Sequence, residues 1–267
     1  MEHQTDPDYL RQQVYNNAYD LDVRTHILTH YLADGPDWYS WLFDQLRLPE
    51  ESRILELGCG PGDLWQQKPP ACLPGGLVCL SDLSPGMVKA ARRCLGCQAR
   101  SIVFAVLDTA ALPFAESTFD AVLAFGLLDH LLDSSQALSE VQRILRPEGL
   151  FYTSAGDQEH LQQIEKLIKP FLPEANYGGD PNRFGLQNGA CCLAQFFGEV
   201  EQRLYENELI FKEPEPIAAY VLSEEEVRQR LSAAQLKAFQ SHLKEKLASQ
   251  GEIRVTIKKG VFSGKQK

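Results

Sequence analysis

Long apolar runs are absent from this sequence. No stretch reaches the roughly 18 to 20 consecutive apolar residues that a membrane-spanning helix requires. Residues 1–19 are polar and acidic, and they lack the basic segment and the following apolar segment of a secretory signal peptide. We therefore expect a protein that does not span a membrane and that resides in the cytoplasm.

Basic residues are scarce. The chain has 26 Lys and Arg against 36 Asp and Glu, which gives a formal net charge of −10 at pH 7. Proteins that bind phosphate backbones normally carry a basic face, whereas here the longest basic runs are pairs such as Arg92-Arg93. The charge argues against DNA or RNA as a partner, although a local basic groove would be compatible with this composition.

Paired metal-binding motifs are also missing. The seven cysteines are an odd number without a secretory signal, so we expect reduced thiols. Cys94 and Cys97 form one CxxC with no second pair at zinc-ligand spacing, so no metal site is predicted. Cys191 and Cys192 are expected to pack as small apolar residues.

Short apolar runs alternate with helical patterns along the middle of the chain. Residues 8–48 are expected to be helical. The alternation that follows predicts a parallel sheet with helices on both faces. The expected strands are 54–57, 77–80, 102–107, 119–125 and 150–154, and the expected helices are 84–95 and 134–145.

The regularity breaks after residue 156. We expect a helix over 157–172 and then a loop over 173–189, which is either a lid over a binding site or surface decoration. A strand is expected over 200–211, and residues 252–262 form a strand pair or one bent strand. A helix is predicted over 223–249, with Ser223 as N-cap and Glu226 as its capping-box partner.

A glycine-rich turn follows the first strand. Gly58, Gly60 and Gly62 are spaced as GxGxG, rather than the GxGxxG of dinucleotide enzymes, and Asp63 follows them. A carboxylate at this point would oppose a pyrophosphate but would not oppose a ligand with an amine and a sulfonium. A simple tight turn is the alternative interpretation.

Acidic residues end three consecutive strands. Glu56 belongs to the first strand, Asp82 ends the second, and Asp108 ends the third. A carboxylate in the position of Asp82 can accept hydrogen bonds from both ribose hydroxyls, as in NAD enzymes, and Asp108 can accept the adenine amino group. Each acid alone is compatible with a solvated turn, but together they indicate an adenosine-containing ligand.

Four ordered blocks within residues 53–155 resemble the class I methyltransferases that use S-adenosylmethionine, specifically the type 11, small-molecule group. The resemblance implies a Rossmann-like, seven-stranded, mostly parallel sheet with helices on both faces, N-terminal helices and a helical insertion that form a cap. The blocks are residues 54–62, 80–87, 108–122 and 140–149. Glu148 departs from the family pattern, which usually has glycine before Gly149.

The resemblance also implies a division of the chain and a set of cofactor contacts. We expect an N-terminal helical cap (1–48), a core that binds S-adenosylmethionine (49–156), an insertion or lid (157–199) and the C-terminal part of the sheet with a long helix (200–267). The cofactor residues implied are Glu56, Gly58 and Gly60 near the methionine part, Cys59 and Gly62 in the same first block, Asp82 at the ribose, Leu83, Asp108 and Thr109 at the adenine, Met87 in the second block, and Phe125 and Gly126 at the amino-acid end.

Methyl transfer from a sulfonium mainly requires positioning, and a base is needed only where the acceptor must lose a proton. His130 is the candidate base and substrate contact, and packing under the following helix is its alternative. Tyr15, Tyr19 and His26 are candidate substrate residues that are equally compatible with a core role. Phe184 joins them because residues 183–189 resemble an accessory region of small-molecule members.

The sequence thus predicts a methyltransferase for an unidentified small-molecule acceptor, as a monomer or homodimer. An RNA or protein methyltransferase and a non-catalytic protein that binds S-adenosylmethionine are the alternatives. An NAD-dependent oxidoreductase is disfavoured by the GxGxG spacing and by Asp108.

Overall fold

A seven-stranded sheet organises the computed structural model of the chain, which describes residues 18–66, 76–95, 102–175 and 183–267. The strand order is β3-β2-β1-β4-β5-β7-β6, and β7 is the strand that runs antiparallel to both of its neighbours. This confirms the mostly parallel α/β sheet. The strands are β1 (Ile54–Leu57), β2 (Val78–Asp82), β3 (Ile102–Val106), β4 (Phe119–Ala124), β5 (Leu145–Gly156), β6 (Gly198–Phe211) and β7 (Ile253–Lys265).

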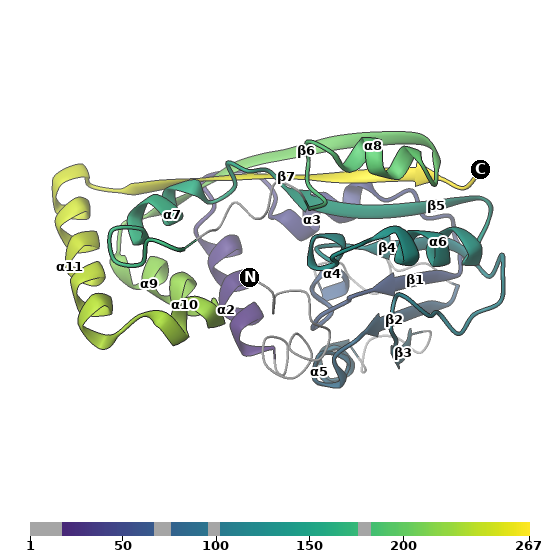
Figure 1. The fold of residues 1–267 in the computed structure, drawn as a ribbon, viewed down its shortest axis with the longest axis horizontal. Coiled ribbons are helices and arrows are strands. Elements are labelled where there is room, and N and C mark those ends of the chain that lie inside the picture. Colours follow the sequence, from purple (N-terminus) through teal and green to yellow (C-terminus); the bar gives the residue numbers. More distant parts are fainter. Residues whose placement is uncertain (1–17, 67–75, 96–101, 176–182) are drawn as a thin grey trace.

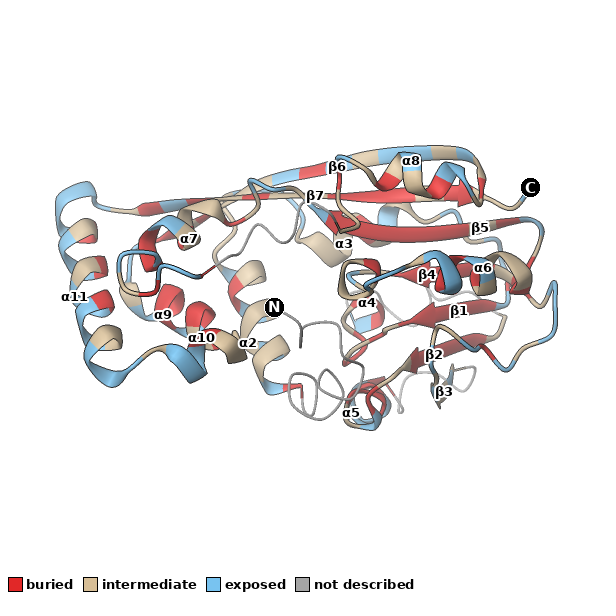
Figure 2. Cartoon of the chain, viewed as in Figure 1, coloured by how far each residue is buried: buried red, intermediate tan, exposed pale blue. Residues whose placement is uncertain are grey.

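Helices cover both faces of the parallel part of the sheet. On one face, α3 (Trp38–Gln45), α4 (Asp63–Gln66) and α5 (Pro85–Leu95) pack over a buried cluster that includes Leu42 and Ile54. On the other face, α6 (Ser135–Ile144) and α8 (Gly189–Ala194) enclose a second cluster. Because both faces are covered, β1 is buried along its whole length (Figure 2), which explains why its residues other than Glu56 are apolar.

A separate group of helices lies at the end of the molecule where β6 and β7 extend beyond β5 (Figure 1). A third apolar cluster holds this end together, with Phe239 and Leu243 among its fully buried residues. Its members come from segments far apart in the chain. The helices are α2 (Tyr19–His30), α7 (Gln162–Ile168), α9 (Pro214–Leu222), α10 (Glu225–Arg230) and α11 (Ala233–Gln250).

The predicted helix over 223–249 is wrong, because the chain forms two helices there and Leu231 between them is extended (φ −83°, ψ 110°). The capping box belongs to Ser232 and Gln235, not to Ser223 and Glu226. Ser223 Oγ instead donates to the Tyr220 carbonyl at 2.6 Å. Both serines begin the same pattern, with Glu or Gln three residues later, so the local sequence alone does not distinguish them.

Other boundaries differ from the sequence prediction by a few residues. Residues 253–265 form one strand rather than a strand pair, and α7 begins at Gln162, after turns, rather than at residue 157.

Glu148, which departs from the family pattern, has φ +67°, a left-handed conformation that favours glycine. Its carboxylate forms an ion pair with Lys265 at 2.5 Å.

Candidate functional site

The glycine turn after β1 requires its glycines. Gly58, Gly60 and Gly62 have φ values of +67°, +53° and +87°, all in the left-handed region. A Cβ on Gly62 would lie 2.7 Å from Cδ1 of the buried Leu95 on α5. The turn is therefore pressed against α5, and its backbone faces the carboxyl edge of the sheet.

Substitution of Gly62 by alanine is expected to combine backbone strain with a steric clash. We expect strain of roughly 1–2 kcal/mol, plus roughly 1–3 kcal/mol for overpacking against Leu95. Gly35→Ala is the matched control, because Gly35 has φ +76° and a Cβ added to it would meet nothing within 4 Å. Denaturant unfolding of both variants tests this prediction, and equal losses of stability would contradict the close packing of the turn.

Asp82 connects the turn after β1 to the turn after β2. Its Oδ2 accepts the Gly60 N–H at 3.0 Å, and its Oδ1 accepts the Ser84 N–H at 2.8 Å. Burial raises the pKa of Asp82, while these two N–H donors and the His130 ring act in the opposite direction. Asp82 thus presents a half-buried carboxylate beside the glycine turn.

Glu56 is the most buried acid of the site, with 4% of its surface exposed. Trp65 Nε1 donates to its Oε2 at 2.5 Å. Burial raises the pKa of Glu56 to about 8, the Trp65 hydrogen bond opposes this, and the carboxylates of Asp63 and Asp82 add to the increase. A cation placed among these three acids would relieve their repulsion, so the site favours a cationic ligand.

Asp63 joins the glycine turn to the N-terminal helices. It begins α4, and its Oδ2 accepts a hydrogen bond from Thr25 Oγ1 on α2 at 3.0 Å. Burial raises the pKa of Asp63, and hydrogen bonds from Thr25 and Tyr39 lower it. The helix that covers this edge of the sheet is thereby attached to the turn itself.

The strand ends beyond Asp82 contribute the remaining predicted cofactor residues. Asp108 is exposed just after β3, and its Oδ1 accepts the Ala110 N–H at 2.8 Å; Thr109 is half-buried beside it. Leu83 and Phe125 are half-buried. Gly126, with φ +60°, is exposed after β4 and donates its N–H to Ser154 Oγ at 3.0 Å.

Besides Glu56, two other predicted cofactor residues, Met87 and Cys59, have buried side chains. Met87 packs in a small cluster with Ala18, Ala90 and Leu21, where it holds α5 against the start of α2. Cys59 is 7% exposed, and burial raises the pKa of its thiol. Its backbone N–H donates to the Ser81 carbonyl at 2.9 Å, so the backbone of Cys59, rather than its sulfur, shapes the turn.

The predicted substrate residues do not all come together. His130 ends the 3-10 helix η4 (Leu128–His130) and is near enough to Asp82 to lower its pKa. In contrast, Tyr19 is 71% exposed, and the exposed His26 stacks on His30 with ring centroids 3.9 Å apart. Phe184 packs edge-on against Phe262 in the second cluster, and Tyr15 lies outside the described residues.

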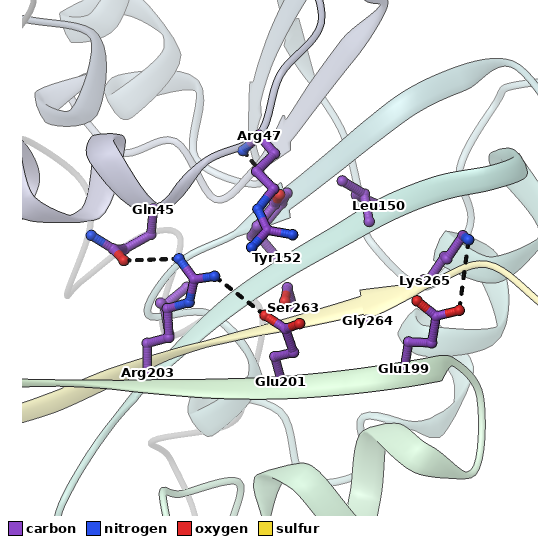
Figure 3. Close-up of a pocket in the computed structure, with 11 residues that line it drawn as sticks. Gln45, Arg47, Leu150, Tyr152, Glu199, Glu201, Arg203, Ser263, Gly264 and Lys265 are labelled. Atoms are coloured by element: carbon purple, nitrogen blue, oxygen red, sulfur yellow. Dashed lines mark hydrogen bonds and ion pairs between the residues drawn. The ribbon is translucent and has the colours of Figure 1, made fainter.

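A hollow on the sheet lies apart from this site (Figure 3). It is lined by side chains of β5, β6 and β7 and by Gln45 and Arg47, and it contains none of the predicted site residues. Arg203 contacts Gln45 at 3.2 Å and Glu201 at 3.3 Å, so the charges in the hollow pair with one another. The carboxyl edge of the sheet is the better candidate for chemistry.

Neither a metal-binding cluster nor a membrane-spanning helix occurs in the described part of the chain. No group of three or more His, Cys, Asp or Glu residues there is arranged to hold a metal ion. No helix in that part is both long and apolar enough to cross a membrane.

Comparison with known proteins identifies a domain within the chain. A family model described as a methyltransferase domain matches residues 55–153. The demethylmenaquinone methyltransferase of Thermus thermophilus is 35% identical over 133 residues, which are 49% of this chain and 60% of that protein. The ubiquinone/menaquinone biosynthesis C-methyltransferase UbiE of Hahella chejuensis is 34% identical over 115 residues, 42% of this chain and 46% of that protein. The chain thus spans about half the length of these relatives.

The fold is also found among solved structures. The crystal structure of the 4+2 cyclase SpnF matches with a TM-score of 0.63 and 16% identity, over 97% of this chain and 96% of that chain. At this identity the likeness concerns the fold alone, and it extends over the helical end as well as the sheet.

Proposed function

We propose that this chain transfers a methyl group from S-adenosylmethionine to a small-molecule acceptor. Its residues 55–153 belong to the class I, type 11 methyltransferase domains, which use that cofactor. The observation that carries the proposal is the group of carboxylates at the glycine turn. Glu56 and Asp82 lie beside Gly58–Gly62, and the buried Glu56 has a pKa raised to about 8. A cationic ligand fits this donor set, and a pyrophosphate does not.

Each residue of the edge has a distinct task in this proposal. Asp82 would accept the ribose hydroxyls, Asp108 and Thr109 would contact the adenine, and Glu56 would face the cationic amino-acid end of the cofactor. The bound cofactor supplies a methyl group already activated on a sulfonium. The protein then has to hold donor and acceptor in line and exclude water, and such positioning is worth roughly 7–11 kcal/mol of the barrier.

His130 is our candidate for proton removal, where the acceptor requires it. It lies beyond the end of β4 and close enough to Asp82 to affect its pKa. The relatives described above are named for menaquinone and ubiquinone synthesis, which supports a cyclic, unsaturated acceptor for this chain. The net charge of −10 disfavours a nucleic acid in that place.

S-adenosylmethionine and S-adenosylhomocysteine are expected to raise the melting temperature of the protein, and NAD is not. A ligand at 100 times its Kd stabilises the folded state by about 2.7 kcal/mol, which a thermal unfolding scan resolves. Omission of ligand is the baseline, and adenosine alone separates the nucleoside contribution from that of the methionine part. An equal shift with NAD would contradict the cofactor assignment.

Release of S-adenosylhomocysteine on addition of an acceptor tests the proposed methyl transfer. Methyl transfer predicts one S-adenosylhomocysteine for each acceptor consumed, whereas a non-catalytic protein that binds S-adenosylmethionine would leave the cofactor intact.

A further inference from the structure

The outer edge of β6 has no strand beside it over most of its length. β6 is the last strand in the sheet order, and β7 pairs with its inner edge (Figure 1). Near the end of β6, the segment after α2 covers the outer edge. There the Ala33 N–H donates to the Glu208 carbonyl at 2.9 Å, and the Ile210 N–H donates to the Tyr31 carbonyl at 2.8 Å. Among the described residues, no backbone hydrogen bond reaches the outer edge of β6 before Glu208.

The alternation of the strand shows which backbone groups face this open edge. The backbone groups of Glu208 and Ile210 point outward, and every second residue of a strand points its N–H and C=O the same way. β6 and β7 keep one register from Glu201 to Phe211. The N–H and C=O groups of Gln202 and Leu204 therefore point outward too. A row of such groups can pair with a strand of another chain.

The side chains along the open edge differ between the two faces of the sheet. Glu201 and Arg203 both point into the hollow (Figure 3), where Arg203 Nη2 lies 3.3 Å from Glu201 Oε2. Their side chains are 54% and 39% exposed, respectively, so both charges remain open to a further partner. On the opposite face, Val200 packs at the margin of the second cluster, and Leu204 is 51% exposed. One face of the edge thus carries two opposite charges, and the other carries two apolar side chains.

A second, antiparallel copy of this edge matches both faces. If Gln202 lies opposite Gln202 of the partner subunit, Glu201 lies opposite Arg203 of the partner subunit. Val200 then lies opposite Leu204 of the partner subunit, and two-fold symmetry repeats each of these pairs. Gln202, Val200 and Leu204 take the hydrogen-bonded positions of the ladder. The charged residues take the other positions, where opposing Cα atoms are only about 4.5 Å apart. Pairing centred on Glu201 or on Arg203 instead would place like charges opposite each other.

We propose that this chain forms a two-fold symmetric dimer in which two β6 edges pair antiparallel, centred on Gln202. The open stretch runs from Gly198, where β6 begins, to Glu206, and Gln202 is its midpoint. It contains neither proline nor lysine, which commonly block the edges of sheets. β6 bulges between Gly198 and Glu201, so we expect the regular ladder over residues 200–204. The dimer does not depend on the proposed methyl transfer.

A charge exchange across the two-fold axis tests this dimer. The full-length chain is studied by sedimentation equilibrium at roughly 1–100 μM, where a dimer of moderate affinity dissociates measurably. Glu201→Arg and Arg203→Glu each place like charges opposite each other twice, and each should raise the dissociation constant of the dimer about tenfold or more. The double variant Glu201→Arg/Arg203→Glu restores opposite charges. Its dissociation constant should return to within about threefold of that of the wild type.

Arg254→Glu is the matched control. Arg254 is an exposed residue of β7 that pairs with Glu208 at 2.9 Å and with Glu252 at 2.8 Å, beyond the open stretch. It changes the net charge as Arg203→Glu does, and it should leave dimerisation unaltered. Far-UV circular dichroism confirms that each variant is folded.

Gln202→Pro provides a test that does not depend on charge. It removes an outward N–H and keeps the ladder with β7, so it should give a folded monomer. The proposal is overturned if the wild type stays monomeric over the whole concentration range. It is also overturned if neither charge variant weakens the dimer, if the double variant does not restore it, or if a folded Gln202→Pro variant dimerises as the wild type does.

Discussion

Asp82→Ala is expected to weaken the binding of S-adenosylmethionine by about 1–3 kcal/mol, which is roughly five- to 150-fold in Kd. The reason is twofold. The substitution removes the proposed acceptor of the ribose hydroxyls, and it also leaves the N–H groups of Gly60 and Ser84 without their present partner. The glycine turn and the turn after β2 then lose their connection, so part of the loss reflects a less ordered site. Isothermal titration calorimetry with S-adenosylhomocysteine measures the loss of cofactor affinity.

Asp133→Ala is the matched control for Asp82→Ala. Asp133 Oδ1 accepts the Ser135 N–H at 2.8 Å, the same local contact that Asp82 Oδ1 makes with Ser84, but Asp133 is exposed and precedes α6. The control should therefore change stability slightly and leave cofactor affinity unaltered. Equal affinities in the Asp82→Ala variant and the wild type would remove Asp82 from the ribose role.

Glu56→Gln is expected to stabilise the cofactor-free protein at alkaline pH and to weaken the cofactor complex. The folded protein holds the Glu56 pKa at about 8, above the ordinary 4.5. A raised carboxyl pKa contributes stability below pH 4.5, and this contribution is lost as the pH rises through 8. Glutamine does not ionise, so the melting temperature of the variant should rise relative to that of the wild type between pH 5 and pH 8. Thermal scans at several pH values would show this difference.

Cofactor binding should show the opposite pH dependence. Below about pH 8 the free protein holds a proton on Glu56, and a bound cation would displace it. The wild-type affinity should therefore rise with pH up to about 8, with release of a proton to the buffer, and Glu56→Gln should lack this component. Glu174→Gln, at an exposed position, is the control. A pH profile that is the same in wild type and Glu56→Gln would contradict a cation beside Glu56.

The first five strands and the edge that they form could be predicted from the sequence because their signals are local. A parallel strand covered on both faces is mostly apolar, as β1 is apart from Glu56, and residues that end or follow such strands meet at one edge. The positions of Glu56, Asp82 and Asp108 at this edge could therefore be predicted from the strand pattern alone. The roles proposed for them remain predictions that the experiments above address.

The helical end could not be predicted, because it depends on contacts between distant parts of the chain. Its core joins Ile27 to Ile257, and no local pattern indicates that pairing. Lys258 and Lys259 show the same limit on a smaller scale. Two adjacent lysines on a strand face opposite sides, and only the register of β7 with β5 and β6 decides which of them lies under Trp38.

The position of β7 has a consequence for the order of folding. β7 is inserted between β5 and β6, although it comes after both in the chain. While the ribosome is still making residues 253–265, β5 has an unpaired edge, and β6 has no partner in the sheet. Open edges of this kind invite association with other chains. The sheet, and the Lys259 position with it, is therefore completed only after residues 253–265 have been made, and shortening the chain before residue 253 would expose the edge of β5.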